Sequence, residues 1–206
     1  MGGFRLGVSG NVGLYETSGK EVENGETNTA KTEEALAGMG SVFVEVSLSR
    51  LPGPLGRLSL GYDQVIHDIK TGTSSRTETD KIDAASGFAA QRGVENTASA
   101  TISNMNTLYL TANLTDWLYV KGGMMDMDVT TTETLQTGST YGNASLDGTV
   151  YGVGFNFVTD SGIFTRVEYN KTDIDGHVFT SSNADNKVTL DDITGSSGKV
   201  SIGKSF

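Results

Sequence analysis

The chain of 206 residues contains no cysteine, two prolines, two histidines and one tryptophan. The absence of cysteine excludes disulfide bonds and thiolate metal sites, and it fits export through an oxidising compartment. No apolar run approaches the roughly 18 residues that a membrane-spanning helix needs. A membrane protein is still allowed, since the strands of a membrane barrel face lipid only at every second residue.

The chain is acidic, with a formal net charge of −10. It has no basic stripe that could displace phosphate counterions, so nucleic acid is excluded as a partner. Its carboxylates gather in long polar stretches, where they either form a solvated surface or attract divalent cations, and their spacing selects no particular ion. These carboxylates are Glu16, Glu21, Glu23, Glu26, Glu33, Glu34, Asp185, Asp191 and Asp192.

The amino end has no basic stretch followed by an apolar core, so it is not a signal peptide. A membrane barrel of the kind that the strand pattern below predicts has to be exported before it can insert. We therefore expect that a signal peptide has been removed and that Met1 is a start codon placed before the mature chain.

What the sequence does contain is a series of strand-like segments whose seven connections alternate long and short. The long polar stretches are 17–34, 71–103, 133–148 and 173–197, and the short ones are 50–56, 115–116 and 159–162. A barrel whose first strand runs outward through a membrane has long loops outside and tight turns inside. The sequence thus predicts an all-β fold, an eight-stranded antiparallel up-and-down transmembrane β-barrel with four long outer loops and three short periplasmic turns, as one domain over residues 1–206.

The first segment shows the strand period of two most clearly. Leu6, Val8 and Val12 occupy even positions, whereas Gly7 and Ser9 lie between them. Across the segments the opposite face is rich in Gly, Ser and Asn, which suits the crowded interior of a narrow barrel. A soluble β-sandwich is the alternative, because alternation alone fits it as well.

The same alternation points several charged or titratable side chains into the lumen. Buried charges persist only when they are paired and hydrogen-bonded, so we expect a polar network that largely plugs the barrel, with Arg5 and Glu45 as a neighbouring pair. A charge-gated narrow pore, a porin-like diffusion channel for small solutes, is the alternative. The predicted lumen network is Arg5, Glu45, Asp63, His67, Lys121, Arg166 and Glu168.

Aromatic residues next to the inner turns and the termini match an interfacial belt, although ordinary strand propensity also favours aromatics. The predicted interfacial aromatics are Phe4, Trp117, Phe157 and Phe206.

At these residues the chain resembles the small eight-stranded outer-membrane barrels of the OmpA transmembrane-domain, OmpX and Opa type. The resemblance is carried by residues 112–118 (ANLTDWL), 150–155 (VYGVGF), 166–169 (RVEY) and 200–206 (VSIGKSF). It covers the strands, about half of the chain, and not the long loops. It implies a cell outer membrane location in contact with outer-membrane lipid and lipopolysaccharide.

In that family the barrel-assembly machinery reads a terminal aromatic residue preceded by alternating apolar residues. Val200, Ile202 and Phe206 match this signal, whereas Lys204 departs from it. The resemblance thus implies the assembly machinery as a partner during biogenesis. It implies no cell-wall anchoring, since no peptidoglycan-binding domain follows.

An enzyme is the contrasting hypothesis, because some small outer-membrane barrels act on lipids. Catalysis of that kind needs a nucleophile, a base and an orienting acid held together. The chain has only His67 and His177 as candidate bases, and no serine lies in a Gly-x-Ser-x-Gly turn. We therefore expect no enzymatic activity, no cofactor and no metal site.

The long stretches suggest two contact elements for a surface ligand or a neighbouring envelope protein. Ile82, Ala85 and Phe88 share a helical face, so a short amphipathic turn could sit above the barrel or pack on its own loops. Residues 177–180 and 187–190 predict a hairpin that extends the seventh and eighth strands outward.

Overall fold

Pairing between the first and the last long strand closes the sheet of the computed structural model into a ring. The structure describes residues 3–23, 26–27, 31–78, 94–134, 140–182 and 186–206. The ring runs through β1 (Phe4–Glu23), β3 (Lys31–Ser47), β4 (Leu58–Val65), β7 (Val94–Asn113), β8 (Leu118–Thr134), β9 (Ala144–Val158), β10 (Ile163–Ile174) and β13 (Ile193–Ser205). Each strand is antiparallel to its neighbours, and β1 pairs with both β3 and β13. The predicted all-β ring of eight antiparallel strands is confirmed.

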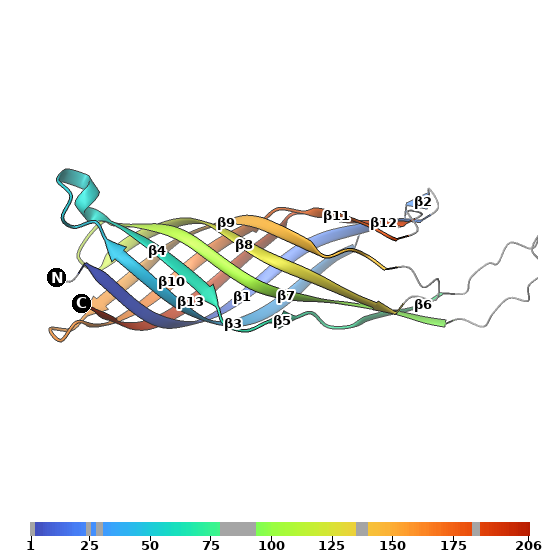
Figure 1. Cartoon of the computed structure of the whole chain (residues 1–206), viewed down its shortest axis with the longest axis horizontal. Helices are drawn as coiled ribbons and strands as arrows, with labels where there is room; N and C mark the ends of the chain where they lie inside the picture. Colours follow the sequence, from blue (N-terminus) through green and yellow to red (C-terminus); the bar gives the residue numbers. More distant parts are fainter. Residues whose placement is uncertain (1–2, 24–25, 28–30, 79–93, 135–139, 183–185) are drawn as a thin grey trace, which may run out of the picture.

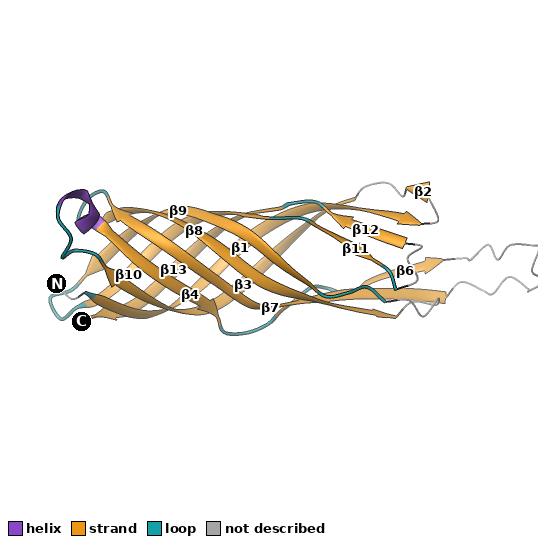
Figure 2. Cartoon of the chain, turned by 45° about the horizontal axis from the view of Figure 1, so that its top comes forward, coloured by secondary structure: helices purple, strands orange, loops and turns teal. Residues whose placement is uncertain are grey.

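The two ends of the barrel differ (Figure 1). Both termini and the short 3₁₀ helix η1 (Gly53–Arg57) lie at one end, which we call the inner end. The opposite, outer end carries the short strands β2 (Glu26–Thr27), β6 (Ser74–Glu78), β11 (His177–Thr180) and β12 (Asn186–Leu190), and β5 (Ile69–Lys70) lies on the way to it. The strands are strongly tilted, as a second view shows (Figure 2), which is the geometry that closing a narrow barrel requires.

Side chains alternate between the outside and the inside of this ring. In β10 every second residue is buried from Phe164 to Ile174, and the residues between them are exposed. Outward-facing apolar residues such as Val8 (53% exposed) and Val200 (60% exposed) form an exposed apolar band on the outside of the ring, toward its inner end. Among the described residues, no helix is long and apolar enough to cross a membrane.

The strands continue much farther into the long polar stretches than the sequence predicts. β1 ends at Glu23 and β3 begins at Lys31, whereas 17–34 was expected to be loop. Likewise β7 begins at Val94, β8 ends at Thr134 and β9 begins at Ala144. The expectation is wrong because the outward face of these strand ends is polar, so the apolar alternation stops while the backbone pairing goes on.

The inner connections are close to the predicted turns, with one difference. Residues 48–57 join β3 to β4 through η1, a longer connection than the predicted 50–56. In the next turn the Thr115 hydroxyl accepts a hydrogen bond from the Leu118 amide (2.9 Å). In the third turn Gly162 has a φ of 81°, a left-handed conformation that glycine adopts without strain.

The predicted outer hairpin of the last long stretch is present. β11 and β12 pair from His177 with Leu190 to Thr180 with Lys187. The hairpin is anchored on the barrel because β12 also pairs with the outer part of β1, from Gly19 to Glu23. The predicted helical turn of Ile82, Ala85 and Phe88 lies outside the described residues.

Candidate functional site

The centre of the lumen is a carboxylate clamped between two guanidinium groups. Glu45 of β3 is fully buried, and Arg166 of β10 reaches across the bore to it with two hydrogen bonds of 2.8 Å. Arg5 of β1 donates a third bond to Glu45 (2.6 Å) from the adjacent strand, where the two residues are register partners. The negative charge of the buried carboxylate is thus compensated, as its burial requires, and the triad carries one positive charge in excess.

Two further ion pairs lie beside this triad. Lys121 of β8 lies 3.4 Å from Glu168 of β10, whose other carboxylate oxygen accepts a 2.6 Å bond from the Tyr119 hydroxyl. Lys199 of β13 donates to Asp63 of β4 over 2.5 Å. We call the seven charged residues of the triad and these two pairs the ionic plug: Arg5, Glu45, Asp63, Lys121, Arg166, Glu168 and Lys199.

Aromatic rings around the plug lie over glycines of the neighbouring strand. Tyr109 covers Gly61, its register partner, so closely that a Cβ on the glycine would fall 2.2 Å from the ring. Tyr119 lies in the same way over Gly154, with a separation of 2.5 Å. The two other such pairs are Phe43 over Gly7 and Phe164 over Gly203.

These four aromatic–glycine pairs draw one residue from each of the eight strands, and they give the inward glycines a packing reason. The rings of these pairs also contact the cations of the ionic plug. The Arg166 guanidinium lies 5.0 Å from the centre of the Phe164 ring and 5.3 Å from that of Tyr119. The Lys121 ammonium lies 4.7 Å from the centre of the Tyr109 ring. Such contacts stabilise a cation that has lost its water shell.

On the outer side of the plug is a small cavity of about 50 Å³. Lys121, Lys199 and Asp63 line it, together with the buried amides of Asn11 and Asn170. The carbonyl oxygens of these two amides have no hydrogen-bond partner in the described part of the chain. A cavity with this lining and size suits one or two water molecules that bridge the ammonium and amide groups.

Beyond the cavity the interior becomes apolar. Four methionines from three strands pack together there, namely Met39, Met105, Met125 and Met127. Val129, Leu146 and Ile174 complete this cluster. A bulge in β7, where Asn104 has a φ of 51°, inserts the extra residue that keeps both Met105 and Ile102 facing inward.

Of the predicted lumen residues, the structure brings Arg5, Glu45, Asp63, Lys121, Arg166 and Glu168 into the ionic plug. His67 is elsewhere, exposed and beyond the end of β4 at Val65, because the alternation no longer applies where the strand has ended. Its Nε2 atom accepts a hydrogen bond from the Gly40 amide (2.9 Å), which leaves Nδ1 to donate to the Asp68 carbonyl oxygen (3.1 Å).

Sequence reasoning missed Lys199 and the phenols of Tyr109 and Tyr119. All three lie on the inward row of their strands, so extending the same alternation by one residue in β13, and asking which inward aromatics carry a hydroxyl, would have found them.

The remaining candidates lie on the outside. Val200, Ile202 and Phe206 all point away from the lumen, and the Phe206 ring lies 6.2 Å from that of Phe4 at the inner end. The Lys204 ammonium reaches toward that end and donates to the Ser161 carbonyl oxygen (2.6 Å).

The two other interfacial aromatics also lie on the outside near the inner turns. Trp117 (51% exposed) stacks on Phe155 with ring centres 5.6 Å apart, and Phe157 is 57% exposed.

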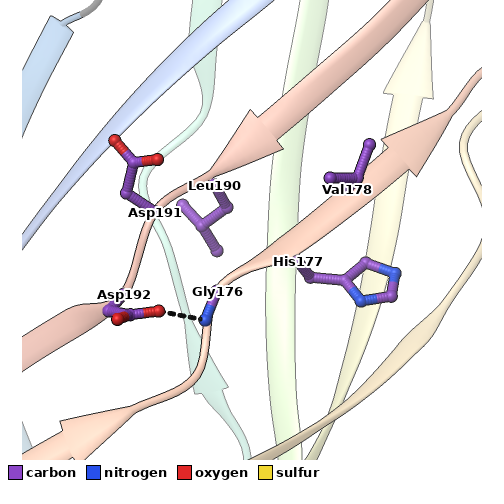
Figure 3. Close-up of a pocket in the computed structure, with 6 residues that line it drawn as sticks. All are labelled: Gly176, His177, Val178, Leu190, Asp191 and Asp192. Atoms are coloured by element: carbon purple, nitrogen blue, oxygen red, sulfur yellow. Dashed lines mark hydrogen bonds between the residues drawn. The ribbon is translucent and has the colours of Figure 1, made fainter.

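A second hollow, of about 610 Å³, lies beside two short connections between strands (Figure 3). One connection joins β10 to β11 and the other joins β12 to β13. Asp192 accepts a hydrogen bond from the Gly176 amide there (2.9 Å), while the ring of His177 points away from the carboxylates of Asp191 and Asp192. The His177 ring instead contacts Phe179 edge-on at 4.7 Å. Within the described ranges, no group of three or more His, Asp or Glu side chains is arranged to hold a metal ion.

Together these features define a class: a closed eight-stranded antiparallel barrel with an exposed apolar girdle and a charged, tightly filled interior. No protein family and no curated protein matches the sequence. Among solved structures, the outer membrane protease OmpT from Escherichia coli shares 11% identity at a TM-score of 0.48, covering 98% of this chain and 96% of that one.

Two smaller barrels are also similar. The attachment invasion locus protein Ail of Yersinia pestis shares 9% identity at a TM-score of 0.34, covering 93% of this chain and 97% of that one. Neisserial surface protein A shares 8% identity at a TM-score of 0.37, covering 96% of this chain and 97% of that one. At such identities the likeness is one of fold alone.

Proposed function

We propose that this chain is an integral outer-membrane β-barrel of the OmpA transmembrane-domain, OmpX and Opa type, with a structural and surface-interaction role and a lumen closed by the ionic plug. The observation that carries the proposal is the inversion of polarity. Outward rows of Val, Leu, Phe and Tyr are exposed, whereas Glu45, Arg166 and Glu168 are at most 5% exposed. A soluble protein would arrange these side chains the other way.

Strand length supports the assignment. A tilted strand needs about 9–11 residues to cross the hydrocarbon layer. On β1 the outward apolar row from Phe4 to Leu14 has this length and ends before Glu16. The rest of β1, up to Glu23, then stands outside the membrane, among lipopolysaccharide headgroups and solvent. The outward positions of Val200, Ile202 and Phe206 suit recognition by the assembly machinery.

Refolding into detergent tests the architecture. A closed barrel resists SDS until it is boiled, so the unheated chain is expected to migrate faster on a gel than the heated one. A chain with the same mobility before and after heating contradicts the proposal.

A narrow diffusion channel is the second candidate, and the small cavity beside Lys121 and Lys199 favours it, since it is a space inside the bore that charged side chains line. Planar-bilayer recordings separate the two roles. We expect negligible conductance from the wild type and from Arg166→Ala, because the four aromatic–glycine pairs still fill the bore. A clear conductance in the wild type that changes with Glu45→Ala or Arg166→Ala supports the channel instead.

A lipid-modifying enzyme is not proposed. The nitrogens of His67 contact two backbone groups, the ring of His177 contacts Phe179, and within the described residues no hydrogen bond joins either histidine to a serine that could act as a nucleophile.

A further inference from the structure

In the described part of the chain, the wall of the barrel is incomplete beyond the outer end of β4. The ladder between β3 and β4 ends at Ser41 with Val65, but β3 continues to Lys31 and remains paired with β1 along this whole length. β5 and β6, which follow β4, pair with β7 and not with β3. One edge of β3 between residues 31 and 39 is thus without a strand partner in the described part of the chain.

The last closed position shows which backbone groups face this edge. The Gly40 carbonyl accepts from the Ile66 amide (3.1 Å), and the Gly40 amide donates to His67 Nε2 (2.9 Å), so both groups of Gly40 point away from β1. In an antiparallel ladder, alternate residues direct their groups to the same side. The residues that present free N–H and C=O groups to the edge are accordingly Gly38, Leu36, Glu34 and Thr32.

In the described part of the chain this edge lacks most of the usual protections, although Lys31, Glu33 and Glu34 give it charged side chains. Natural edge strands are kept short, bulged or covered, or carry proline or an inward charge. Here the edge runs over nine residues without a proline or a bulge, and His67 covers only its first position.

The position of this edge relative to the apolar band also makes it accessible from outside the membrane. Leu36 is the register partner of Leu14, the last apolar residue of the outward row of β1, and Glu34 is the partner of Glu16. The edge begins at the upper limit of the apolar band and rises beyond it.

The side chains next to the edge specify a chemistry. Glu16 and Glu34 are exposed, face outward and lie directly opposite each other, an arrangement of like charges that destabilises a sheet unless a cation is near. Glu33 already has Lys31 as its ion-pair partner. Leu36 follows Glu34 on the outward row of β3, and at 76% it is the most exposed of the large apolar side chains that the structure describes.

We propose that the free edge of β3 binds an extended, basic peptide segment of another protein, which adds to the barrel as a further antiparallel strand. Edge addition draws its affinity from main-chain hydrogen bonds and its specificity from alternate side chains. The segment carries an apolar residue opposite Leu36 and, two residues later, a Lys or Arg opposite Glu34. The inference rests on the proposed surface-interaction role and names the partner chemistry for it.

The probe is a fluorescent ten-residue peptide of alternating Val and Thr with one apolar-x-Arg motif. It is added to the full chain in nanodiscs, and binding is followed by anisotropy and by amide hydrogen exchange. We expect the amides of Gly38, Leu36 and Glu34 to exchange freely in the free protein and at least tenfold more slowly with peptide. The same peptide with every second amide N-methylated keeps its charge but loses the edge-facing donors, so it should not bind.

Variants of the chain test the same geometry. Leu36→Pro removes one edge-facing donor and leaves the amides that face β1, so it should weaken binding at least tenfold. Glu34→Gln together with Glu16→Gln should weaken binding at low salt, whereas Asp160→Asn, at an inner turn, is the matched control and should leave it unchanged.

Three results overturn the proposal: equal binding of the N-methylated peptide, amides of the edge that are already slow in the free chain, or no binding to a barrel that is intact by heat-modifiable mobility. The proposal is also overturned if, without any peptide, the edge amides exchange more slowly as the protein concentration rises. That result would show that the edge binds a second copy of the chain. Loss of heat-modifiable mobility, in contrast, refutes the barrel itself, so the two failures are distinguishable.

Discussion

Arg166 and Glu45, 121 residues apart in the sequence, face each other across the bore and share two hydrogen bonds of 2.8 Å. No neighbouring-strand register places them together, since β13 and β1 lie between β10 and β3 in the ring. The two residues therefore meet only when β1 has paired with β13, so their contact depends on closure of the ring.

Glu45→Ala leaves the buried Arg166 and the partly buried Arg5 without their shared carboxylate. Removing one partner of a buried ion pair costs about 3–5 kcal/mol, so the free energy of unfolding in urea should fall by about that amount. Glu33→Ala, which removes an exposed carboxylate of the same strand, should change it by less than about 1 kcal/mol. Similar effects of both variants would show that the triad contributes no special stability.

Gly61→Ala introduces a Cβ 2.2 Å from the Tyr109 ring, so the ring or the strand must move. Overpacking of this kind costs about 1–3 kcal/mol in unfolding free energy. Gly122→Ala is the matched control, because a Cβ there meets no atom within 4 Å. In the background of Tyr109→Leu the penalty at position 61 should shrink, and an undiminished penalty would refute the ring as its cause.

Lys199 and Asp63 should be energetically coupled. A double-mutant cycle of Lys199→Met and Asp63→Asn is expected to give an interaction energy of about 0.5–3 kcal/mol, the range for residues within one hydrogen-bonded network. The same cycle with Lys199→Met and the exposed Glu33→Gln should be additive within about 0.5 kcal/mol. Additivity in the first cycle would show that the 2.5 Å contact does not persist in the membrane.

Outside the apolar band, Asp128 of β8 accepts hydrogen bonds from Asn104 (2.9 Å) and Ser145 (2.8 Å), and the bond from Asn104 contributes most to holding the pKa of this carboxyl below its ordinary value. Because the folded-state pKa is lowered, the stability from these bonds is present above the ordinary pKa and is lost as the pH falls through the folded-state value. Carboxyl NMR titration should show the low pKa.

Asn104→Gly tests the cause, because glycine tolerates the φ of 51° while removing the amide. In this variant the pKa of Asp128 should move toward its ordinary value. An unchanged titration would assign the shift to Ser145 or to another source.

The ring and its strand number were predicted from the alternation of long and short connections, together with the resemblance to small outer-membrane barrels. The alternation of single residues predicted the inward direction of Glu45, Lys121 and Arg166, because the side-chain period of a strand is two whatever surrounds it. This prediction failed where the outward face of a strand is as polar as the inward face, so that the alternation disappears. Above Leu14 and Met124 the outward row meets polar surroundings, so the strands look like loops in the sequence although their ladders continue.

Two features could not be predicted for other reasons. The position of His67 depends on where β4 stops pairing, which hydrogen bonds decide and not polarity. The pairing of Arg166 with Glu45 depends on the stagger with which the ring closes, a property of all eight strands together.

The most direct test of the whole account uses the absence of cysteine. Single substitutions Val44→Cys and Val200→Cys on the outward rows and Ser201→Cys on the inward row are spin-labelled, and their contact with oxygen dissolved in lipid and with a water-soluble nickel reagent is measured in bilayers. The account predicts high oxygen contact and no nickel contact at 44 and 200, and little contact with either at 201. Free nickel contact at positions 44 and 200 would place the apolar rows in water and contradict the membrane barrel.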